Sequence, residues 1–275
     1  MLHEVFHNQL VLQGKLVCDT AVRIGTGESH EPAGTGLPVI KDAFGYPFIP
    51  GSSLKGVLRS RIESFVRAAL QGRRGACNPV GGKVDWCVSE MKSEMRPEDL
   101  YEQTCLVCRA FGSPWLASKI QICDAMLADR ELWFGQYQVR NGVAIDRDTQ
   151  TVSGKQLYDY EVVPAQTRFA LQLVAENLRD AQIGMLFIGL RPFVRREIAI
   201  GGGRSRGLGM VELQWRERKL FAVNGELDRL FRFLDDDQGA ETWTSLSDEV
   251  IRQTYLPAFR KELEDMVKEG SEPHA

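Results

Sequence analysis

Two glycine-rich segments that also carry cations lie far apart in this chain of 275 residues. The first, 48–59, reads FIPGSSLKGVLR, and the second, 201–209, reads GGGRSRGLG. Glycines at a turn leave backbone N–H groups uncovered, and such groups bind phosphate well. Because the sequence contains no nucleotide-hydrolysis motif, the two segments together predict a groove for a polyanion.

The pattern of apolar residues predicts an α+β fold. The order strand, helix, strand, strand, helix, strand indicates a ferredoxin-like (RRM-like) sheet with large insertions, which is a common RNA-binding platform. The expected elements are a strand at 10–24, a helix capped by Ser52 or Ser53 and running to about Leu70, strands at 118–127 and 161–176, a buried helix at 178–190 and a strand at 209–218.

Three further segments are expected to elaborate this core within a single domain of residues 1–275. The first, about 73–109, is an insertion with little apolar content and four cysteines. The second, about 138–160, is polar and turn-rich, which is typical of a projecting β-hairpin, although a surface loop would have the same composition. The third, about 226–275, has two amphipathic helical stretches, at 227–234 and 246–267. Their acidic face is expected to pack on a neighbouring element or subunit.

The net charge of −3 argues against a general nucleic-acid coat but permits a local basic groove, because the arginines cluster. One cluster lies within 59–74 and another within 191–206. This pattern suits a subunit that offers cations to RNA, although two solvated helix faces would also produce it. The N-terminus shows no signal-peptide pattern and no apolar stretch is long enough to span a bilayer, so a cytoplasmic protein without a membrane partner is expected.

Four of the six cysteines are spaced as metal ligands. Cys105 and Cys108 form a C-x-x-C knuckle, and Cys77 and Cys87 flank a turn-rich loop upstream. Thiolates at this spacing can reach one tetrahedral ion, so we expect a structural zinc site that contributes folding energy to the insertion. Unrelated free cysteines are the alternative, and a thioredoxin-like motif is disfavoured because no βαβ pattern surrounds the knuckle. The remaining two cysteines are expected to be core residues: Cys18 and Cys123.

The sequence has no motif for nucleophilic hydrolysis, nucleotide hydrolysis or a zinc protease. The glycine run at 201–203 precedes a strand rather than a helix, which excludes a dinucleotide-binding loop. Hydroxyls and cations at the start of the first helix and in the late glycine-rich loop are expected to hold RNA phosphates, although the arginines of that loop could also belong to a solvated turn. The predicted RNA-binding residues are Ser52, Ser53, Lys55, Arg59, Gly203, Arg204, Ser205 and Arg206.

These segments resemble those of the RAMP proteins of CRISPR systems. The resemblance rests on Ile-Pro-Gly-Ser-Ser-Leu-Lys-Gly at 49–56 before a helix, on residues 105–121 and on the late glycine-rich loop. More narrowly, the chain resembles the repeating (group seven) backbone subunit of type III effector complexes, in the variety that carries a cysteine-rich insertion. The resemblance implies a zinc finger at the four cysteines, and a thumb hairpin at about 138–160 that wedges between guide and target bases.

The resemblance also implies a metal-dependent aspartate that cuts target RNA, shortly before a Pro-Val-Ile-Lys-Asp segment. Here that segment is 38–42, and the family's aspartate would fall at about Gly36, so it is absent. The remaining candidates for catalysis, with Mg²⁺ as the metal, are the loop acids Glu28 and Glu31 and, in the segment itself, Asp42, which is also expected to order a hairpin turn. RNA can also be cut without a protein metal site where a hairpin strains its backbone for in-line attack.

The sequence therefore predicts a guide-RNA-binding backbone subunit of a type III CRISPR antiviral effector complex. Its partners would be guide RNA, complementary target RNA and other RAMP subunits with which it stacks. Base pairing would supply specificity, so binding by the protein is expected to be salt-dependent and largely independent of sequence. Two alternatives remain: a metal-dependent endoribonuclease subunit, and a zinc-stabilised RNA-binding module outside CRISPR.

Overall fold

The computed structural model describes residues 4–26, 36–72, 75–78, 80–82, 85–88, 95–145, 148, 152–235 and 242–271. Its centre is a five-stranded antiparallel sheet with the strand order β3-β7-β1-β8-β9. The strands are β1 (Asn8–Cys18), β3 (Ile120–Ile122), β7 (Arg168–Glu176), β8 (Val211–Ala222) and β9 (Thr244–Ser245).

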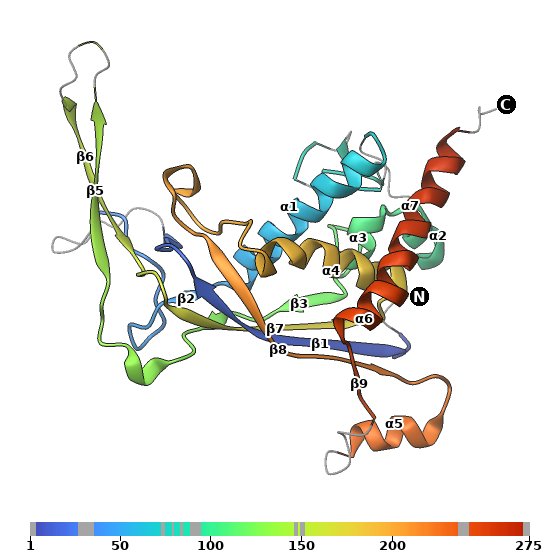
Figure 1. Cartoon of the computed structure of the whole chain (residues 1–275). Helices are drawn as coiled ribbons and strands as arrows, with labels where there is room; N and C mark the ends of the chain where they lie inside the picture. The colour runs from blue at the N-terminus through green and yellow to red at the C-terminus, as the bar shows by residue number, and fades with distance from the viewer. Residues whose placement is uncertain are drawn as a thin grey trace.

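Three helices lie over one face of this sheet (Figure 1): α1 (Gly51–Ala69), α4 (Asp180–Val194) and α7 (Leu256–Ser271). Along the chain, the sheet and its first two helices follow the order β1, α1, β3, β7, α4, β8, in agreement with the predicted order of elements. The buried residues of α1 recur with the predicted helical spacing and pack into the main core: Leu54, Leu58, Ile62 and Val66.

Helix α1 begins at Gly51, and the prediction that Ser52 or Ser53 caps it is wrong. The backbone N–H of Gly51 instead donates to Oδ1 of Asp124 at 2.7 Å. A Cβ at Gly51 would lie only 2.0 Å from the carbonyl oxygen of Ile122, so this close approach requires glycine. A carboxylate from a distant part of the chain therefore occupies the place that a local serine would have taken.

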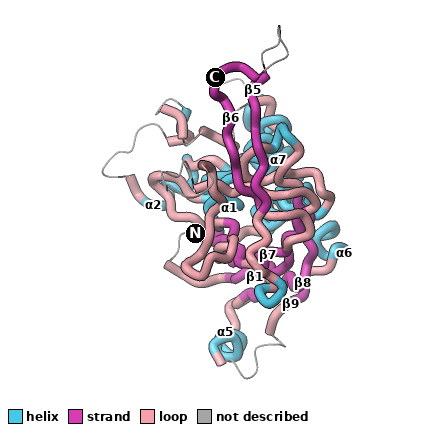
Figure 2. The backbone as a smooth tube through the Cα atoms, turned by 90° about the vertical axis from the view of Figure 1, so that its left-hand side faces the viewer, coloured by secondary structure: helices cyan, strands magenta, loops and turns pink. Residues whose placement is uncertain are grey.

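A two-stranded antiparallel hairpin, β5 (Gln138–Ile145) and β6 (Val152–Val162), rises away from the sheet (Figures 1 and 2). Its lower end joins the body, because Val162 is fully buried and Leu37 forms a bridge with Tyr160. The hairpin thus stands over the segment that follows β1.

The remaining elements connect these parts. Between α1 and β3 the chain forms α2 (Pro97–Gln103) and α3 (Leu106–Phe111). Two short strands pair with each other, β2 (Phe48–Ile49) before α1 and β4 (Ala125–Met126) after β3. Single 3-10 turns are η2 (Arg130–Leu132) and η3 (Arg204–Arg206).

Both helices predicted for the C-terminal region are present. The first is α5 (Leu227–Leu234); the second runs from α6 (Asp248–Val250) through the π-helical turn η5 (Ile251–Tyr255) into α7. Glu262 of α7 pairs with Arg179, just before α4, at 2.8 Å, so an acidic residue of this region does pack on a neighbouring element. Among the described residues, no helix combines the length and the apolar character that crossing a membrane requires.

Candidate functional site

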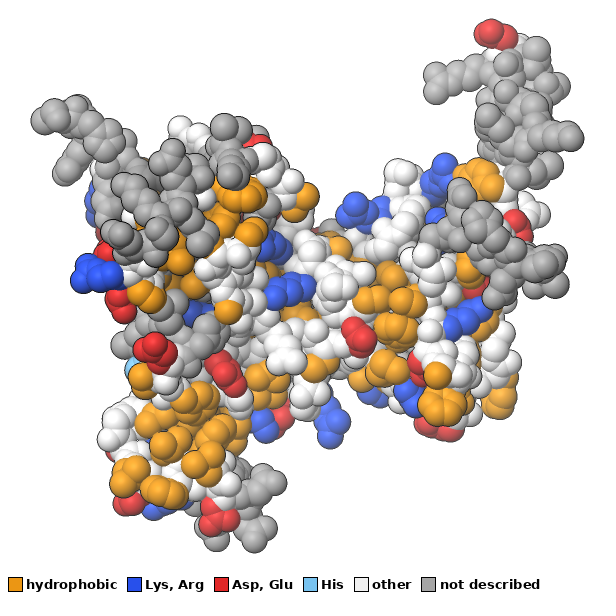
Figure 3. Space-filling view, turned by 180° about the vertical axis from the view of Figure 1, so that it is seen from behind, with side chains coloured by type: hydrophobic (Ala, Val, Ile, Leu, Met, Phe, Trp, Pro, Cys, Tyr) orange, Lys and Arg blue, Asp and Glu red, His pale blue; other side chains and the backbone are white. Residues whose placement is uncertain are grey.

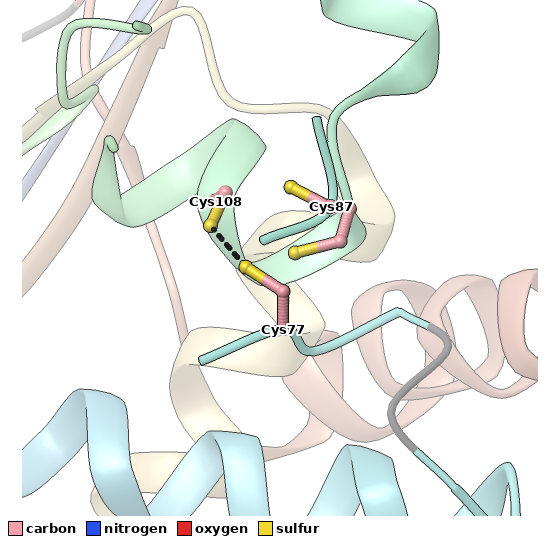
Figure 4. A group of neighbouring side chains, drawn as sticks. Cys77, Cys87 and Cys108 are labelled. Carbon is pink, nitrogen blue, oxygen red and sulfur yellow. Dashed lines mark hydrogen bonds between the residues drawn. The ribbon is translucent and has the colours of Figure 1, made fainter. Parts of the chain in front are cut away.

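Four cysteines converge at the start of α3 (Figure 4). Cys105 immediately precedes this helix and Cys108 lies in its first turn, whereas Cys77 and Cys87 come from irregular segments between α1 and α2. Their sulfur atoms all lie within 4.8 Å of one another, and those of Cys77 and Cys108 are 3.4 Å apart. The structure therefore brings together the four residues that spacing singled out.

These sulfur atoms fit a tetrahedral metal. Four ligands about 2.3 Å from a zinc ion would be separated from one another by about 3.8 Å, close to the spacing observed. Hydrogen bonds from the thiols of Cys108, Cys77 and Cys87 hold the pKa of Cys105 far below its ordinary value, so a thiolate is already favoured in the cluster. An all-sulfur set of this kind suits a soft cation such as zinc.

One face of α1 fixes the cluster in place. Nη2 of Arg59 donates to Sγ of Cys108 at 3.2 Å, and Nη2 of Arg67 donates to the carbonyl oxygen of Cys77 at 2.7 Å. Glu63, one turn from each arginine, accepts from both at 2.8 and 3.3 Å. This ladder of i, i+4 side chains was not predicted, although its spacing is visible in the sequence.

Lys55 and Arg59, predicted to hold phosphates, make their hydrogen bonds within the protein. Nζ of Lys55 donates to Oγ of Ser118 at 2.6 Å and to the carbonyl oxygen of Ile120 at 2.9 Å. Nη1 of Arg59 donates to the carbonyl oxygen of Gly112 at 2.9 Å. Burial, with a smaller effect of Arg59, lowers the pKa of Lys55. Contact with RNA stays a prediction for these two residues, as it does for the exposed Ser52 and half-buried Ser53.

The late glycine-rich loop packs against the chain that follows β1. The N–H of Gly202 donates to the carbonyl oxygen of Arg23 at 2.8 Å. Gly203 and Gly207, with φ of 75° and 80°, flank the turn η3 and adopt a left-handed conformation that favours glycine. Because both ends of η3 turn sharply, its three side chains, Arg204, Ser205 and Arg206, are exposed.

Two tyrosines of β6 complete this surface, and sequence reasoning missed them. The rings of Tyr158 and Tyr160 stack with centroids 6.0 Å apart. The guanidinium of Arg206 lies 5.7 Å above the Tyr158 ring, and its Nη1 donates to the Tyr158 hydroxyl. Residues two apart on a strand share a face, and this spacing was the signal available in the sequence.

Arg23 is the third residue that was missed. Its guanidinium lies 5.5 Å from the centre of the Tyr160 ring, and its buried Nε has no hydrogen-bond partner among the described residues. A cavity of about 240 Å³ separates the glycine-rich loop from the hairpin here, lined by Arg23, Tyr160, Gly203, Ser205, Arg206 and Leu208. We call it the loop–hairpin cavity. Cations and aromatic faces around one opening can hold a phosphate and stack on a base.

Gly36, where the resemblance places an aspartate, faces a carboxylate from another segment. Its backbone N–H lies 3.4 Å from Oδ1 of Asp159 on β6, and a Cβ at Gly36 would be 3.4 Å from the same oxygen. A carboxylate is therefore present beside residue 36, although residue 36 itself is a glycine and carries none.

Of the three predicted candidates for catalysis, the structure describes one. Asp42 orders the hairpin turn as expected, because its Oδ1 accepts from the N–H groups of Phe44 and Tyr46, each at 2.9 Å. Glu28 and Glu31 lie outside the described residues.

Comparisons with known proteins point to one family. The sequence model of the RAMP superfamily matches residues 15–212. A protein named CRISPR system Cms endoribonuclease Csm3, from Methanocaldococcus jannaschii, is 28% identical in an alignment 223 residues long, and the match covers 77% of this chain and 80% of that protein. A protein of the same name from Methanothermobacter thermautotrophicus is 25% identical in an alignment 255 residues long, and the match covers 80% of this chain and 91% of that protein. The matched residues include the cysteine cluster and the loop–hairpin cavity.

Proposed function

We propose, from the premise that this chain belongs to the RAMP superfamily, that it is a guide-RNA-binding backbone subunit of a type III CRISPR antiviral effector complex. It stacks with like subunits and positions complementary target RNA. The observation that carries the proposal is the loop–hairpin cavity, where two arginines, a tyrosine ring and the glycine-rich loop meet. Its chemistry suits a nucleic-acid strand rather than a small apolar ligand.

In this proposal the cavity and its rim bind the backbone and the bases differently. Arg204 and Arg206 attract phosphate oxygens, and the buried Nε of Arg23 gains an acceptor when a phosphate enters. The stacked rings of Tyr158 and Tyr160 offer a platform for a base, and such stacking is worth about 1–3 kcal/mol per base. None of these contacts is to the edge of a base, so base pairing by the guide RNA supplies the sequence specificity.

The architecture supports the same proposal. The strand order β3-β7-β1-β8, in which α1 joins β1 to β3 and α4 joins β7 to β8, supports the inference of a ferredoxin-like core. We infer one RAMP domain over 1–275, in which the hairpin at about 138–160 is the thumb and about 226–275 is a helical tail.

We assign the cysteine cluster to a structural zinc ion that ties the insertion at about 73–109 to α1. Four protein sulfurs leave no open coordination position for a substrate, so the ion would supply folding energy rather than chemistry. Arg59, Glu63 and Arg67 orient the ligands from outside, as outer groups do around many metal sites. Arg59 belongs to this support in our assignment, and the cations at η3 carry the RNA contact.

A second candidate function is cleavage of the target RNA, because both relatives are named endoribonucleases. The observation that favours it is Asp159, whose carboxylate lies beside Gly36 at the base of the hairpin. Carboxylate oxygens are ligands of Mg²⁺, which would supply the charge stabilisation that cutting of RNA requires. Asp159 would hold the ion next to the strand bound at the loop–hairpin cavity.

The test assembles the complex with labelled guide RNA and measures binding of that guide over a range of salt concentrations. The double variant Arg23→Gln/Arg206→Gln is compared with Arg216→Gln, an exposed arginine of β8 outside the cavity. In the double variant we expect weaker guide binding and a salt slope that is smaller by about 1 for each phosphate it no longer binds, and in the control we expect no change. Equal affinity and slope in both variants would refute the binding role of the cavity.

The same assembly tests cleavage. Regular cuts in the target that disappear in Asp159→Asn, while target binding is unchanged, would establish the second function and its acid. Cuts that persist in Asp159→Asn would exclude this carboxylate, and absence of cuts with tight binding would leave the subunit a scaffold.

A further inference from the structure

Helix α5 carries apolar side chains on two faces. Its inner face is held against the body, because the ring of Phe233 stacks on that of Phe221 with centroids 4.1 Å apart. Its outer face exposes Leu227 by 66%, Phe231 by 61% and Leu234 by 66%. At spacings of four and three residues these three form one row, which we call the α5 stripe. Figure 3 shows hydrophobic side chains gathered over this helix, at the lower left of that view.

Acidic residues border the α5 stripe on one side. Asp228 follows Leu227 and Asp235 follows Leu234, and both are exposed. At about 100° per residue, the two acids fall next to Phe231 around the helix. The α5 stripe is therefore an apolar row with a negative edge.

A groove with the opposite character lies between α4, β8 and the η5–α7 helix. Its volume is about 350 Å³, and we call it the α4–β8 groove. Its floor is apolar, with Ile251 and Leu256 from the C-terminal helix and an edge-to-face pair of Phe187 and Trp215, whose centroids are 6.3 Å apart. Such a floor accepts apolar side chains of a partner.

The rim of the α4–β8 groove is cationic. Arg191 of α4 and Arg195, which directly follows this helix, line it, and within the part of the chain that the structure describes their guanidinium groups have no ion-pair partner. Arg218 and Arg252 also line it, and Arg218 pairs with the rim's acidic residue, Asp248. Two arginines thus remain available for acids of a partner.

We propose that the α5 stripe of one copy docks in the α4–β8 groove of a second copy, with Asp228 and Asp235 facing Arg191 and Arg195. The apolar row of the α5 stripe would lie on the apolar floor of the α4–β8 groove. The acidic edge of the stripe would face the cationic rim of the groove, so the two surfaces are complementary in polarity and in charge. The lengths match as well, since the eight residues of α5 and the eight residues of α4 from Phe187 to Val194 each span about 12 Å.

The proposal rests on the stacking of like subunits proposed above and names the surfaces that carry it. Because the α5 stripe and the α4–β8 groove are different surfaces, the contact is head-to-tail and leaves one of each free at the two ends of a stack. Stacking of Phe233 on Phe221 keeps the stripe turned away from the body of its own chain.

The experiment measures self-association of the full chain, with its metal, by sedimentation velocity, with and without guide RNA. Phe231→Ser/Leu234→Ser and Arg191→Glu/Arg195→Glu should each weaken self-association roughly tenfold or more, because buried aromatic and arginine anchors dominate interfaces. The matched controls, Phe44→Ser and Arg216→Glu, change exposed residues outside both surfaces and should assemble as the parent does.

A charge exchange decides the pairing. Chains with Asp228→Arg/Asp235→Arg should fail to associate alone, as should Arg191→Glu/Arg195→Glu chains, whereas a chain carrying all four changes should regain stacking. Failure of the four-change chain to recover, while it remains folded by circular dichroism, would overturn the proposal. Stripe variants that assemble as the parent does would overturn it too.

Guide-RNA binding distinguishes failure of the docking proposal from failure of the proposed function. It is measured by filter binding at protein concentrations below those at which the chain self-associates. A parent chain that self-associates through the α5 stripe but binds no RNA would refute the proposed function and leave the docking intact. Loss of RNA binding in Arg191→Glu/Arg195→Glu without loss of self-association would instead assign the groove to RNA.

Discussion

Asp124 should stabilise the start of α1, although it lies far from that helix in the sequence. Its Oδ1 accepts the Gly51 N–H at 2.7 Å, and its negative charge lies at the positive end of a helix of 19 residues. Replacing a capping acceptor by alanine typically costs about 1 kcal/mol, and an acid at a helix N-terminus adds roughly 0.3–1 kcal/mol. Because Asp124 is exposed, solvent screens its charge, so we expect Asp124→Ala to cost about 1.5 kcal/mol.

The assay is urea unfolding followed by circular dichroism, on protein loaded with its metal. Asp124→Asn keeps an acceptor and loses only the charge, so it should cost about 0.5 kcal/mol. Ser52→Ala and Ser53→Ala serve as controls, because neither serine caps the helix, and each should stay within about 0.5 kcal/mol of the parent. In a thermal scan the alanine variant of Asp124 should melt about 3–5 °C earlier.

Two results would refute this reasoning. Equal unfolding midpoints for Asp124→Ala and the parent would show that the long-range contact contributes nothing. A loss in Ser53→Ala as large as that in Asp124→Ala would restore the local cap that the sequence suggested.

Three further predictions follow from single positions. Gly51→Ala places a Cβ 2.0 Å from the carbonyl oxygen of Ile122, so it should lower the free energy of unfolding by about 3 kcal/mol in the same urea assay. An unchanged free energy of unfolding would mean that β3 can move away from the added methyl group without cost. Cys105→Ser should abolish bound zinc and expose the insertion to limited proteolysis, and a parent protein without zinc by metal analysis would exclude the metal. Burial, with a smaller effect of Asp19, raises the pKa of Cys18 to about 12, so the thiol stays protonated and resists alkylation at about pH 8.5. Mass spectrometry of native and unfolded protein tests this, and equal labelling in both would contradict it.

Local patterns were enough to predict much of this protein. Helical spacing predicted the buried row of α1 from Leu54 to Val66, and two-residue alternation predicted a first strand at 10–24, which the structure ends earlier, at Cys18. The C-x-x-C knuckle and the upstream pair predicted which four cysteines converge, because ligand spacing is itself a short-range property. Glycines with cations predicted the exposed turn η3, where positive φ on both sides requires residues without a side chain.

Tertiary structure alone decided which partner each polar side chain has. Phosphate contact by Arg59 stays a prediction, whereas its place against the Cys108 sulfur and the Gly112 carbonyl group comes from the fold. Asp159 lies beside Gly36, and Arg23 lies over Tyr160, although neither pair is close in the chain.

The physical reason is the range over which each kind of information acts. Burial and backbone geometry repeat with the period of a strand or a helix, so a sequence displays them directly. A hydrogen bond or an ion pair depends on where the sheet register and helix packing bring two distant groups, and no local pattern records that distance. The sequence by itself thus determined most of the elements, the four cysteines of the cluster and the family resemblance. Only the fold decided that Asp124 caps α1, that α1 supports the cysteine cluster, and that the hairpin and the glycine-rich loop share one cavity.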